Sequence, residues 1–481
     1  MTPPPSAPDV QCDAIHDGAR RTLADAHLQE AYHTSTLRLY THRLQAIAEV
    51  PGFEPLRERA RALKREVIEH LDYYVDQFAG NVERQGGQVH WAADAEDACA
   101  IVVEIARHAG AREVVKGKTM VSEEIELNRA FEAAGIDAIE TDLGEFIVQL
   151  ARERPAHIVA PAIHKTRGDV ADLFERGVDS QRTEDPEELA AVARRALRAR
   201  FARAGVGLSG GNFAVAETGT VVVVENEGNI RFSTTAPPVH VVLVGVEKLI
   251  PRFRDLAVFL RLLARSGTGQ KMTSYTSLLT GPRRPHEDGP GEMHVVLVDN
   301  GRTRALADEK MREALYCIRC GACLNACPVY RKIGGHAYGW VYSGPIGALI
   351  TPEFVGLERA RELPFASSLC GACREVCPLK IDIPHLLLHL RGQAAHLGEP
   401  AASADSLVGE RNSIRFWAWL MQSPRRYAWS ARLARLGQRF FARRGWIHRL
   451  PVLPLSRWTE SRDLPALAPR PFRDRWKDIE Q

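Results

Sequence analysis

Seven of the nine cysteines in this 481-residue chain fall between positions 317 and 377, in two short runs. The first run reads Cys317-Ile-Arg-Cys320-Gly-Ala-Cys323-Leu-Asn-Ala-Cys327-Pro328, with the spacing C-x2-C-x2-C-x3-C-P. In bacterial ferredoxins with two clusters, the fourth cysteine of such a run binds the other cluster. Backbone N–H groups in these tight turns point at the inorganic sulfides and stabilise their negative charge. The run therefore predicts iron-sulfur chemistry, in which electrons move one at a time.

The second run, Cys370-Gly-Ala-Cys373-Arg-Glu-Val-Cys377-Pro378, repeats the first but lacks its first cysteine, and Ser367 stands at that position. The ferredoxin rule predicts that the last cysteine of each run joins the other cluster. We expect two [4Fe-4S] clusters, the first bound by Cys317, Cys320, Cys323 and Cys377, and the second by Cys327, Cys370 and Cys373.

The second cluster is one thiolate short, and three interpretations stay open. Its fourth ligand is Ser367 or water, or the cluster is [3Fe-4S], or the isolated Cys12 or Cys99 is recruited. Zinc is disfavoured, because zinc ribbons offer two separated cysteine pairs rather than four cysteines within eleven residues.

Composition places these motifs in an ordinary globular chain, with 45% hydrophobic and 26% charged residues. No stretch reaches the roughly eighteen consecutive apolar residues of a membrane span, and the Pro-rich start lacks the features of a secretory signal. We expect a cytoplasmic protein whose contact with membranes is at most peripheral.

The segments before the cysteines alternate between short apolar runs and helical patterns. Strands are predicted at 88–92, 113–115, 138–141, 157–160, 213–215, 219–225, 240–244 and 294–299. Helices are predicted at 97–108, 123–133 and 186–204. This alternation predicts an α/β domain with a wound parallel sheet covered on both faces, and the Val-rich runs indicate burial on both sides.

Four regions follow from these patterns. We predict an N-terminal helical segment (1–69) that breaks at Pro51 and Gly52, and an α/β domain (70–300). An α-helical, ferredoxin-like two-cluster module (301–400) and a helical C-terminal region (401–481) complete the chain.

Polar residues next to the predicted strands suggest a ligand pocket at one edge of the sheet. Lysines follow one strand and open a helix, a histidine and a lysine follow another, and two carboxylates lie near buried strands. The candidates are Lys116, Lys118, His164, Lys165, Glu217 and Glu225. Their spacing does not identify a reaction.

The C-terminal region is basic and rich in tryptophan. From Arg411 onward it has sixteen Lys and Arg against five Asp and Glu, and it holds six of the eight tryptophans. Packing on the cysteine module or docking to an acidic partner is favoured over a membrane surface, because Pro424, Pro451 and Pro454 interrupt the helices. Nucleic acid is not an expected partner, since no binding motif is present.

The chain resembles the lactate utilization protein B family from about residue 20 into the C-terminal region. The resemblance rests on the cysteine runs and on segments such as Gly207 to Thr220, Thr273 to Ser277 and Gly334 to Gly339. It implies a LUD domain, whose fold is similar to sugar-phosphate isomerase and coenzyme A transferase-like domains. It also implies electron transport in the oxidation of L-lactate to pyruvate, with two partner subunits, a cysteine-rich iron-sulfur protein and a shorter LUD protein.

We therefore predict an electron-transfer subunit of an L-lactate dehydrogenase-type complex rather than a complete enzyme. The sequence shows no flavin or nicotinamide motif, and two-electron chemistry on lactate normally needs an organic cofactor, which favours a partner. Two alternatives stay open. One is a self-sufficient oxidoreductase that binds a hydroxy acid in the LUD pocket, and the other is a redox-responsive binding protein with structural clusters.

Overall fold

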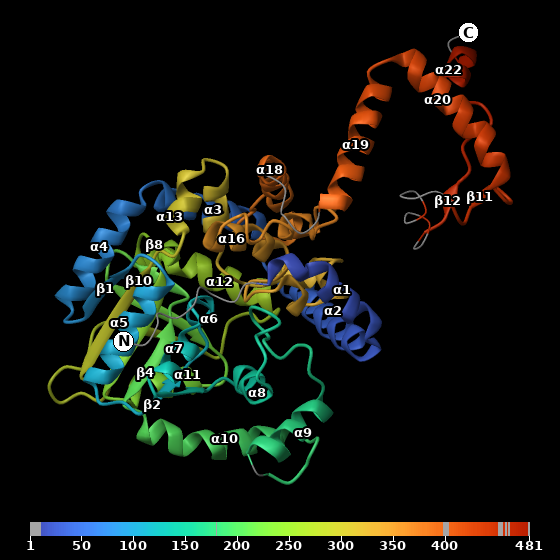
Figure 1. Ribbon diagram of the computed structural model, residues 1–481. Coiled ribbons are helices and arrows are strands. Elements are labelled where there is room, and N and C mark those ends of the chain that lie inside the picture. The colour runs from blue at the N-terminus through green and yellow to red at the C-terminus, as the bar shows by residue number, and fades with distance from the viewer. Residues whose placement is uncertain are drawn as a thin grey trace. The chain divides into compact units, whose positions relative to one another are not determined.

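The structure is a computed structural model that describes residues 11–178, 180–397, 404–450, 456, 459 and 462–479. The chain divides into two compact units, Met1–Leu397 and Gly398–Gln481, which are considered separately below (Figure 1). The predicted N-terminal segment, α/β domain and cysteine module all belong to the first unit.

A six-stranded sheet forms the centre of the first unit, with the strand order β1-β10-β7-β4-β2-β3 (Figure 1). Every neighbouring pair is parallel. The strands are β1 (Gln88–Ala92), β2 (Glu113–Lys116), β3 (Asp137–Glu140), β4 (Val206–Gly210), β7 (Val239–Gly245) and β10 (Glu292–Val298). The prediction of a parallel α/β sheet is confirmed.

Both faces of this sheet are buried, as the Val-rich runs predict. Along β7, Val241 and Leu243 join a core with α5 (Ala95–His108) and α7 (Leu127–Ala133). The alternate residues Val242 and Val244 join a larger core on the opposite face. That core includes side chains of α3 (Phe53–Glu69), α4 (Leu71–Arg84) and α12 (Leu256–Gly267).

Two predicted strands lie outside the parallel sheet. They form a second sheet of four strands in the order β8-β5-β6-β9, in which β6 runs antiparallel to both of its neighbours. The strands are β5 (Phe213–Val215), β6 (Thr220–Glu225), β8 (Leu249–Ile250) and β9 (Tyr275–Leu279). The Gly219 turn, with φ of 69°, reverses the chain between β5 and β6 and makes a hairpin instead of a parallel crossover.

The predicted strand at 157–160 is wrong. The His157 ring accepts hydrogen bonds from the backbone amides of Val159 and Ala160, each at 3.0 Å, and so closes a tight loop. Sequence reasoning also missed β4, whose two glycines weaken the strand pattern. Gly207 is required there, because a Cβ would lie 1.7 Å from the Ser233 carbonyl oxygen.

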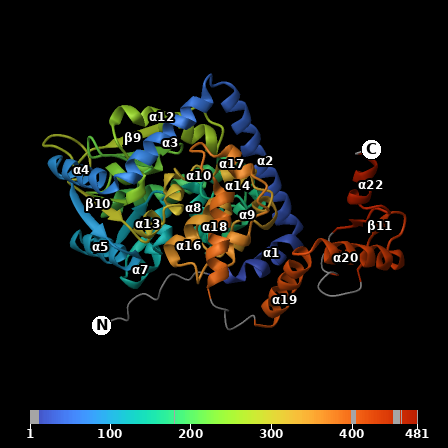
Figure 2. The ribbon, with the colours of Figure 1, turned by 90° about the horizontal axis from the view of Figure 1, so that it is seen from above.

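The N-terminal helices pack against the cysteine region, so that α2 lies beside the short helices of that region (Figure 2). The predicted break at Pro51 and Gly52 is confirmed, with Gly52 at φ 71°, and further breaks occur at Asp25 and His70. The helices here are α1 (Ile15–Ala24) and α2 (Ala26–Ala48), followed by α3 and α4.

The remaining helices of the first unit connect the strands and build the cysteine region. In the α/β part they are α6 (Met120–Glu124), α8 (Leu143–Ala151), α9 (Arg167–Gly177), α10 (Pro186–Arg203) and α11 (Asn229–Thr235). In the cysteine region they are α13 (Arg302–Ala307), α14 (Ala322–Ala326), α15 (Tyr330–Ile333), α16 (Gly344–Val355), α17 (Ala372–Val376) and α18 (Ile383–His396).

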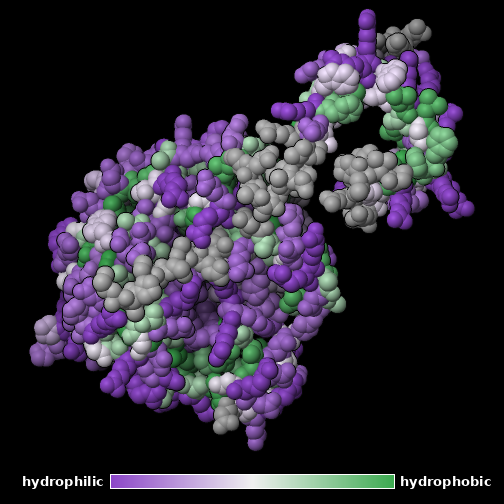
Figure 3. Space-filling view, in the orientation of Figure 1, coloured by the Kyte–Doolittle hydropathy of each residue, from purple (hydrophilic) through white to green (hydrophobic). Residues whose placement is uncertain are grey.

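The second unit is helical, as predicted, with a two-stranded ribbon of β11 (Trp446–Ile447) and β12 (Leu464–Pro465). Its helices are α19 (Ala404–Met421), α20 (Pro424–Gly437) and α22 (Phe472–Ile479). Apolar and hydrophilic side chains are interleaved on its surface (Figure 3). None of the helices described in either unit is long and apolar enough to span a membrane.

Candidate functional site

The seven clustered cysteines form two neighbouring groups. Burial, followed by the proximity of Cys317, raises the pKa of the Cys320 thiol to about 12, and Cys377 and Arg43 are also near. Burial likewise raises the pKa of Cys373 to about 12, with Cys327 and Cys370 as its neighbours. We call Cys317, Cys320, Cys323 and Cys377 the first cysteine group, and Cys327, Cys370 and Cys373 the second. Cys323 of the first group is also within electrostatic range of Cys373 of the second, so the two groups are adjacent.

The two runs fold in the same way. Arg319, at φ 59°, precedes Cys320 in the first run, and Leu369, at φ 54°, precedes Cys370 in the second. Both residues have left-handed backbone. A left-handed glycine then follows, Gly321 at φ 78° and Gly371 at φ 86°, and it caps the short helix α14 or α17. Such turns aim successive backbone N–H groups at one point, which suits an anionic cluster.

Ser367 occupies the place that Cys317 has in the first run. The Arg319 amide donates to the Cys317 sulfur at 3.3 Å, and the Leu369 amide donates to the Ser367 hydroxyl oxygen at 3.1 Å. The serine oxygen therefore accepts the same local hydrogen bond as the thiol at the matching position of the first run.

The donor set fits iron-sulfur clusters. None of the seven cysteines forms a disulfide. A buried thiol with a strongly raised pKa becomes a thiolate at neutral pH only when a metal cation binds it. Positive charge is also close, because Arg43 of α2 donates to the Val376 carbonyl at 2.8 Å and Arg57 of α3 donates to the Cys377 carbonyl at 2.6 Å.

The two groups differ in their surroundings. Cys370 in the second group is exposed, whereas Cys320 and Cys323 in the first are buried. Cys99 lies in a different hydrophobic core and donates to the Ile125 carbonyl at 3.2 Å. Cys12 is buried in the same core as the cysteine region, near the start of the described chain.

A cavity of about 290 Å³ lies beside the first cysteine group. Its walls come from segments that follow the carboxyl ends of β2, β3, β4 and β7, where open α/β sheets bind ligands. The polar side chains of the lining include Lys118, Asp142, Asn212, Glu225, Glu227, Lys248, Gln270 and Arg319, and Cys320 completes the wall.

A buried ion network supports the cationic side of this cavity. Arg302, which is fully buried, donates to both oxygens of Glu124 at 2.8 and 2.9 Å and to Glu247 at 2.5 Å. Glu247 also accepts from Arg319 at 3.3 Å. Burial, followed by the positive charge of Arg319, lowers the pKa of neighbouring Lys248 to about 8. The α/β domain and the first cysteine run are thus joined by paired buried charges.

Comparison with known proteins decides the family. A LUD domain family model matches residues 75–298, a 4Fe-4S dicluster domain matches 313–381, and the C-terminal domain of lactate utilisation protein B matches 391–481. Lactate utilization protein B of Bacillus licheniformis is 41% identical over 97% of this chain and 96% of its own length. The chain belongs to the lactate utilization protein B family. The corresponding protein of Bacillus velezensis is 43% identical over 92% of both chains.

The family match establishes an iron-sulfur dicluster region in this lactate utilization protein B homologue, as the cysteine spacing predicts. A crystal structure of a DUF162 family protein from Deinococcus radiodurans shares 14% identity, with a TM-score of 0.27, over 47% of this chain and 98% of its own.

Only two of the six residues predicted for a LUD pocket line the cavity, namely Lys118 and Glu225. Glu225 accepts from the backbone amides of Ile230 and Arg231, at the start of α11, at 2.8 and 3.0 Å. Lys118 pairs with Glu145 at 2.6 Å, and burial raises the pKa of Glu145 to about 8.

The other four are not part of the lining of this cavity, so the structure does not bring them together with Lys118 and Glu225 there. Lys116 lies between Glu123 and Glu140 at 2.5 and 2.6 Å; burial opposes its charge, but the carboxylates outweigh burial and raise its pKa. Glu217 accepts from the Phe253 amide at 2.8 Å. The remaining two are His164 and Lys165.

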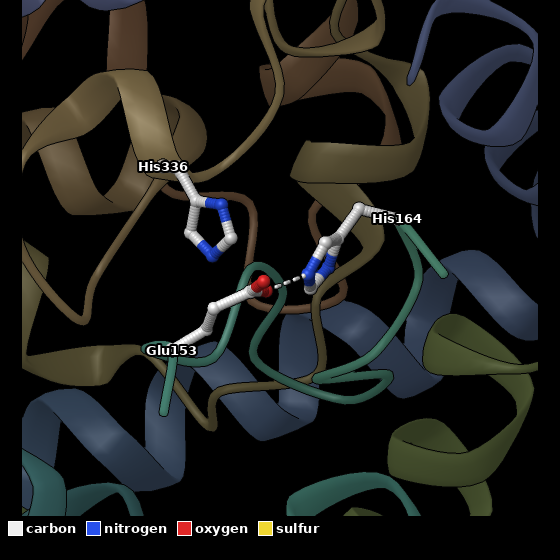
Figure 4. A group of neighbouring side chains, drawn as sticks. All are labelled: Glu153, His164 and His336. Atoms are coloured by element: carbon white, nitrogen blue, oxygen red, sulfur yellow. Dashed lines mark hydrogen bonds and ion pairs between the residues drawn. The ribbon is translucent and has the colours of Figure 1, made fainter. Parts of the chain in front are cut away.

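His164 and Lys165 instead contact Glu153, at 2.6 and 2.5 Å. Figure 4 shows the contact between His164 and Glu153, with His336 nearby. Burial, followed by the charge of His336, lowers the pKa of His164 to about 4, so this ring is neutral at neutral pH. His336 bonds to the Arg154 carbonyl at 2.7 Å. The group ties the loop before α9 to the segment between the cysteine runs. The cavity residues Lys248 and Glu227 were not among the predicted pocket residues, because Lys248 comes near Cys317 and Glu227 comes near Lys118 only in the fold.

Proposed function

We propose that this chain is an iron-sulfur electron-transfer subunit in the oxidation of L-lactate to pyruvate, and that it acts in the cytoplasm. Its full-length relatives are named for lactate utilisation. We assign one [4Fe-4S] cluster to Cys317, Cys320, Cys323 and Cys377. The second is assigned to Cys327, Cys370 and Cys373 with Ser367 at the fourth corner, where loss of one iron would give [3Fe-4S].

The observation that carries this proposal is the position of the two cysteine groups. Cys320 of the first group forms part of the cavity wall, and Cys370 of the second group is exposed. Bound clusters supply one-electron transfer. The first group would receive electrons from the cavity side, and the second would pass them to an acceptor at the surface.

Partner subunits are part of the proposal. Removing two electrons from lactate normally needs an organic cofactor, and no flavin or nicotinamide motif is evident in the sequence. We assign that step to a complex with a cysteine-rich iron-sulfur protein and a shorter LUD protein. The exposed second cysteine group is the part of the chain suited to such a contact.

A self-sufficient oxidoreductase is the second candidate, and the cavity beside Cys320 is the observation that favours it. The two are separated by anaerobic reduction assays on the purified, cluster-loaded chain, with L-lactate and an artificial acceptor. The subunit proposal expects turnover only when both partners are added. Turnover by the chain alone would reject it in favour of the self-sufficient enzyme, and clusters that cannot be reduced would favour a structural role.

A further inference from the structure

Tyr338 has a buried hydroxyl group without a hydrogen-bond partner in the described part of the chain. The side chain is fully buried, and its oxygen neither donates nor accepts a hydrogen bond there. Tyr338 ends the short 3-10 helix His336–Tyr338, in the segment between the two cysteine runs. A buried hydroxyl that makes no hydrogen bond is unfavourable, which indicates a partner other than these residues.

The other fully buried tyrosines of the same core all have partners for their hydroxyl groups. The Tyr330 hydroxyl donates to the Ala156 carbonyl at 2.6 Å, and the Tyr342 hydroxyl donates to Glu124 at 2.8 Å. The Tyr32 oxygen accepts from the Gly335 amide at 3.3 Å. The unsatisfied hydroxyl is therefore a property of position 338 and does not follow from aromatic packing in general.

The surroundings of Tyr338 are cysteines of both groups. Tyr338 is within electrostatic range of Cys327 and Cys373 of the second group and of Cys323 of the first. Its ring centroid lies 6.3 Å from that of Tyr330, whose backbone amide donates to the Cys327 sulfur at 3.5 Å. Tyr338 thus lies where the two cysteine groups adjoin, and most of its cysteine neighbours belong to the second.

The chemistry of the hydroxyl suits a cluster sulfur. Burial, followed by the charge of Cys327, raises the pKa of Tyr338 above the ordinary value of about 10, so the hydroxyl keeps its proton at neutral pH and can donate it in a hydrogen bond. Cluster sulfurs accept hydrogen bonds, and these bonds help to set the reduction potential. A reduced cluster has one more negative charge than an oxidised one, so it accepts such a bond more strongly.

We propose that the Tyr338 hydroxyl donates a hydrogen bond to a sulfur atom of the second cluster and thereby raises the reduction potential of that cluster. The second cluster is chosen because two of the three neighbouring cysteines, Cys327 and Cys373, belong to it. The interaction forms no covalent bond and moves no electron. A higher potential at the second cluster favours electron transfer from the first cluster to the second, and this role rests on the route in the proposed function.

The test removes the hydroxyl and keeps the ring. Tyr338→Phe, as the anaerobic, cluster-loaded full-length chain, should bind as much iron as the wild type. Its second cluster should be harder to reduce by roughly tenfold in the equilibrium constant, which is about 59 mV for one electron. Potentiometric titration followed by EPR measures both clusters. The first cluster should change less, because only Cys323 of the first group is near.

The matched control is Tyr32→Phe. Tyr32 is a buried tyrosine of the same core, but its oxygen is engaged by the Gly335 amide. This variant should leave both potentials unchanged.

A second measurement detects the hydrogen bond itself. Clusters are assembled on the chain in D2O, and hyperfine spectroscopy of the reduced second cluster records the exchangeable deuterons near it. We expect Tyr338→Phe to lose one deuteron coupling that the wild type and Tyr32→Phe retain. Loss of a structural contact alone would not remove a single coupling.

Four results would overturn the inference. These are unchanged potentials in Tyr338→Phe, an equal shift in Tyr32→Phe, deuteron couplings that are the same in all three proteins, and a Tyr338→Phe chain that fails to fold, which would make the hydroxyl a structural group. Any of these, with clusters that still pass electrons from lactate when both partners are added, leaves the proposed function intact. The expected shift in a chain that never receives electrons from lactate would keep this inference and reject the proposed function.

Discussion

At the scale of single residues, the two cysteine runs differ at one position. Ser367 accepts the Leu369 amide just as the Cys317 sulfur accepts the Arg319 amide. A serine oxygen is a weaker ligand for iron than a thiolate, so this corner of the second cluster is the most open to exchange or loss.

Substitution of Ser367 tests this corner. Ser367→Cys supplies the missing thiolate and should keep about eight irons per chain while making the second cluster resistant to oxidation. Ser367→Ala removes the oxygen and should favour a three-iron centre, seen as about seven irons and an EPR signal in the oxidised state. Iron analysis and EPR of anaerobically purified protein provide the measurements.

The control is Ser343→Ala, a buried serine that bonds to the Ala156 carbonyl and is not part of either cysteine group. Identical iron content and oxidation rates in the three Ser367 proteins would contradict a role for this residue at the cluster.

The iron-sulfur dicluster region could be predicted from sequence because the spacing of a turn-bound motif is local information. The cavity could not be predicted in the same way. Lys248 and Arg319 are separated by 71 residues, and they meet only because the Arg302 and Glu247 pair joins two parts of the fold. Lys116 was predicted to line a ligand pocket, but its amine forms ion pairs with two carboxylates, one of them on the neighbouring strand.

At the scale of elements, α2 and α3 hold the end of the second cysteine run. The guanidinium groups of Arg43 and Arg57 donate to backbone carbonyls at Val376 and Cys377. Arg43 also lies within electrostatic range of Cys320 and Cys377. These helices therefore contribute positive charge as well as contacts.

Arg43 should affect the reduction potential of the first cluster. A nearby cation stabilises the more negative reduced state, so Arg43→Met should lower the potential by tens of millivolts, about the effect of one partly screened charge. Arg43→Lys keeps the charge and should restore most of the difference. Potentiometric titration followed by EPR is the measurement, and equal potentials for the Met and Lys variants would contradict the electrostatic role.

Strand β7 carries a buried histidine that makes stability depend on pH. Burial, followed by the charge of His294, lowers the pKa of His240 in the folded chain to about 3. Between pH about 6.5 and 3, the unfolded chain binds a proton at this residue and the folded chain does not, so stability falls as pH falls.

His240→Gln should shift the midpoint of acid unfolding to lower pH. The substitution removes up to about 1.4 kcal/mol per pH unit from the dependence of the unfolding free energy on pH. Circular dichroism of the cluster-loaded protein at a series of pH values measures this midpoint. The exposed His33→Gln is the matched control and should leave it unchanged. An equal shift in both variants would argue against the burial of His240 as the cause.

The elements were predictable where a periodic pattern was uninterrupted. The Val-rich runs of β7 and β10 were found because both of their faces are buried. Loop 157–160 was mistaken for a strand because its apolar residues look like one, and only the contacts of the His157 ring show the turn.

At the scale of the whole molecule, the first unit holds both cysteine groups and all of the contacts described for them. The second unit carries large exposed aromatic side chains, among them Trp417, Trp419 and Trp429. The cysteine groups and the aromatic C-terminal region are thus in separate units.

A chain that ends at Leu397 should therefore fold and bind as much iron as the full-length chain. Iron analysis and visible absorption of the two proteins, purified anaerobically, are the measurements. A chain truncated after Phe365 lacks the second cysteine run, so neither cluster should reach its full iron content. A large loss of iron in the chain that ends at Leu397 would show that the second unit supports the clusters.

The crossed cysteine grouping also sets an order of events during synthesis. In the proposed grouping the first group takes Cys377 from the second run, so the thiols that emerge first from the ribosome wait for a residue made 60 positions later than Cys317. Helix α3, whose Arg57 holds Cys377 by its carbonyl, has been made long before that point. Neither group is complete on a nascent chain that ends before the second run. Both clusters can therefore be completed only after nearly the whole first unit has been translated.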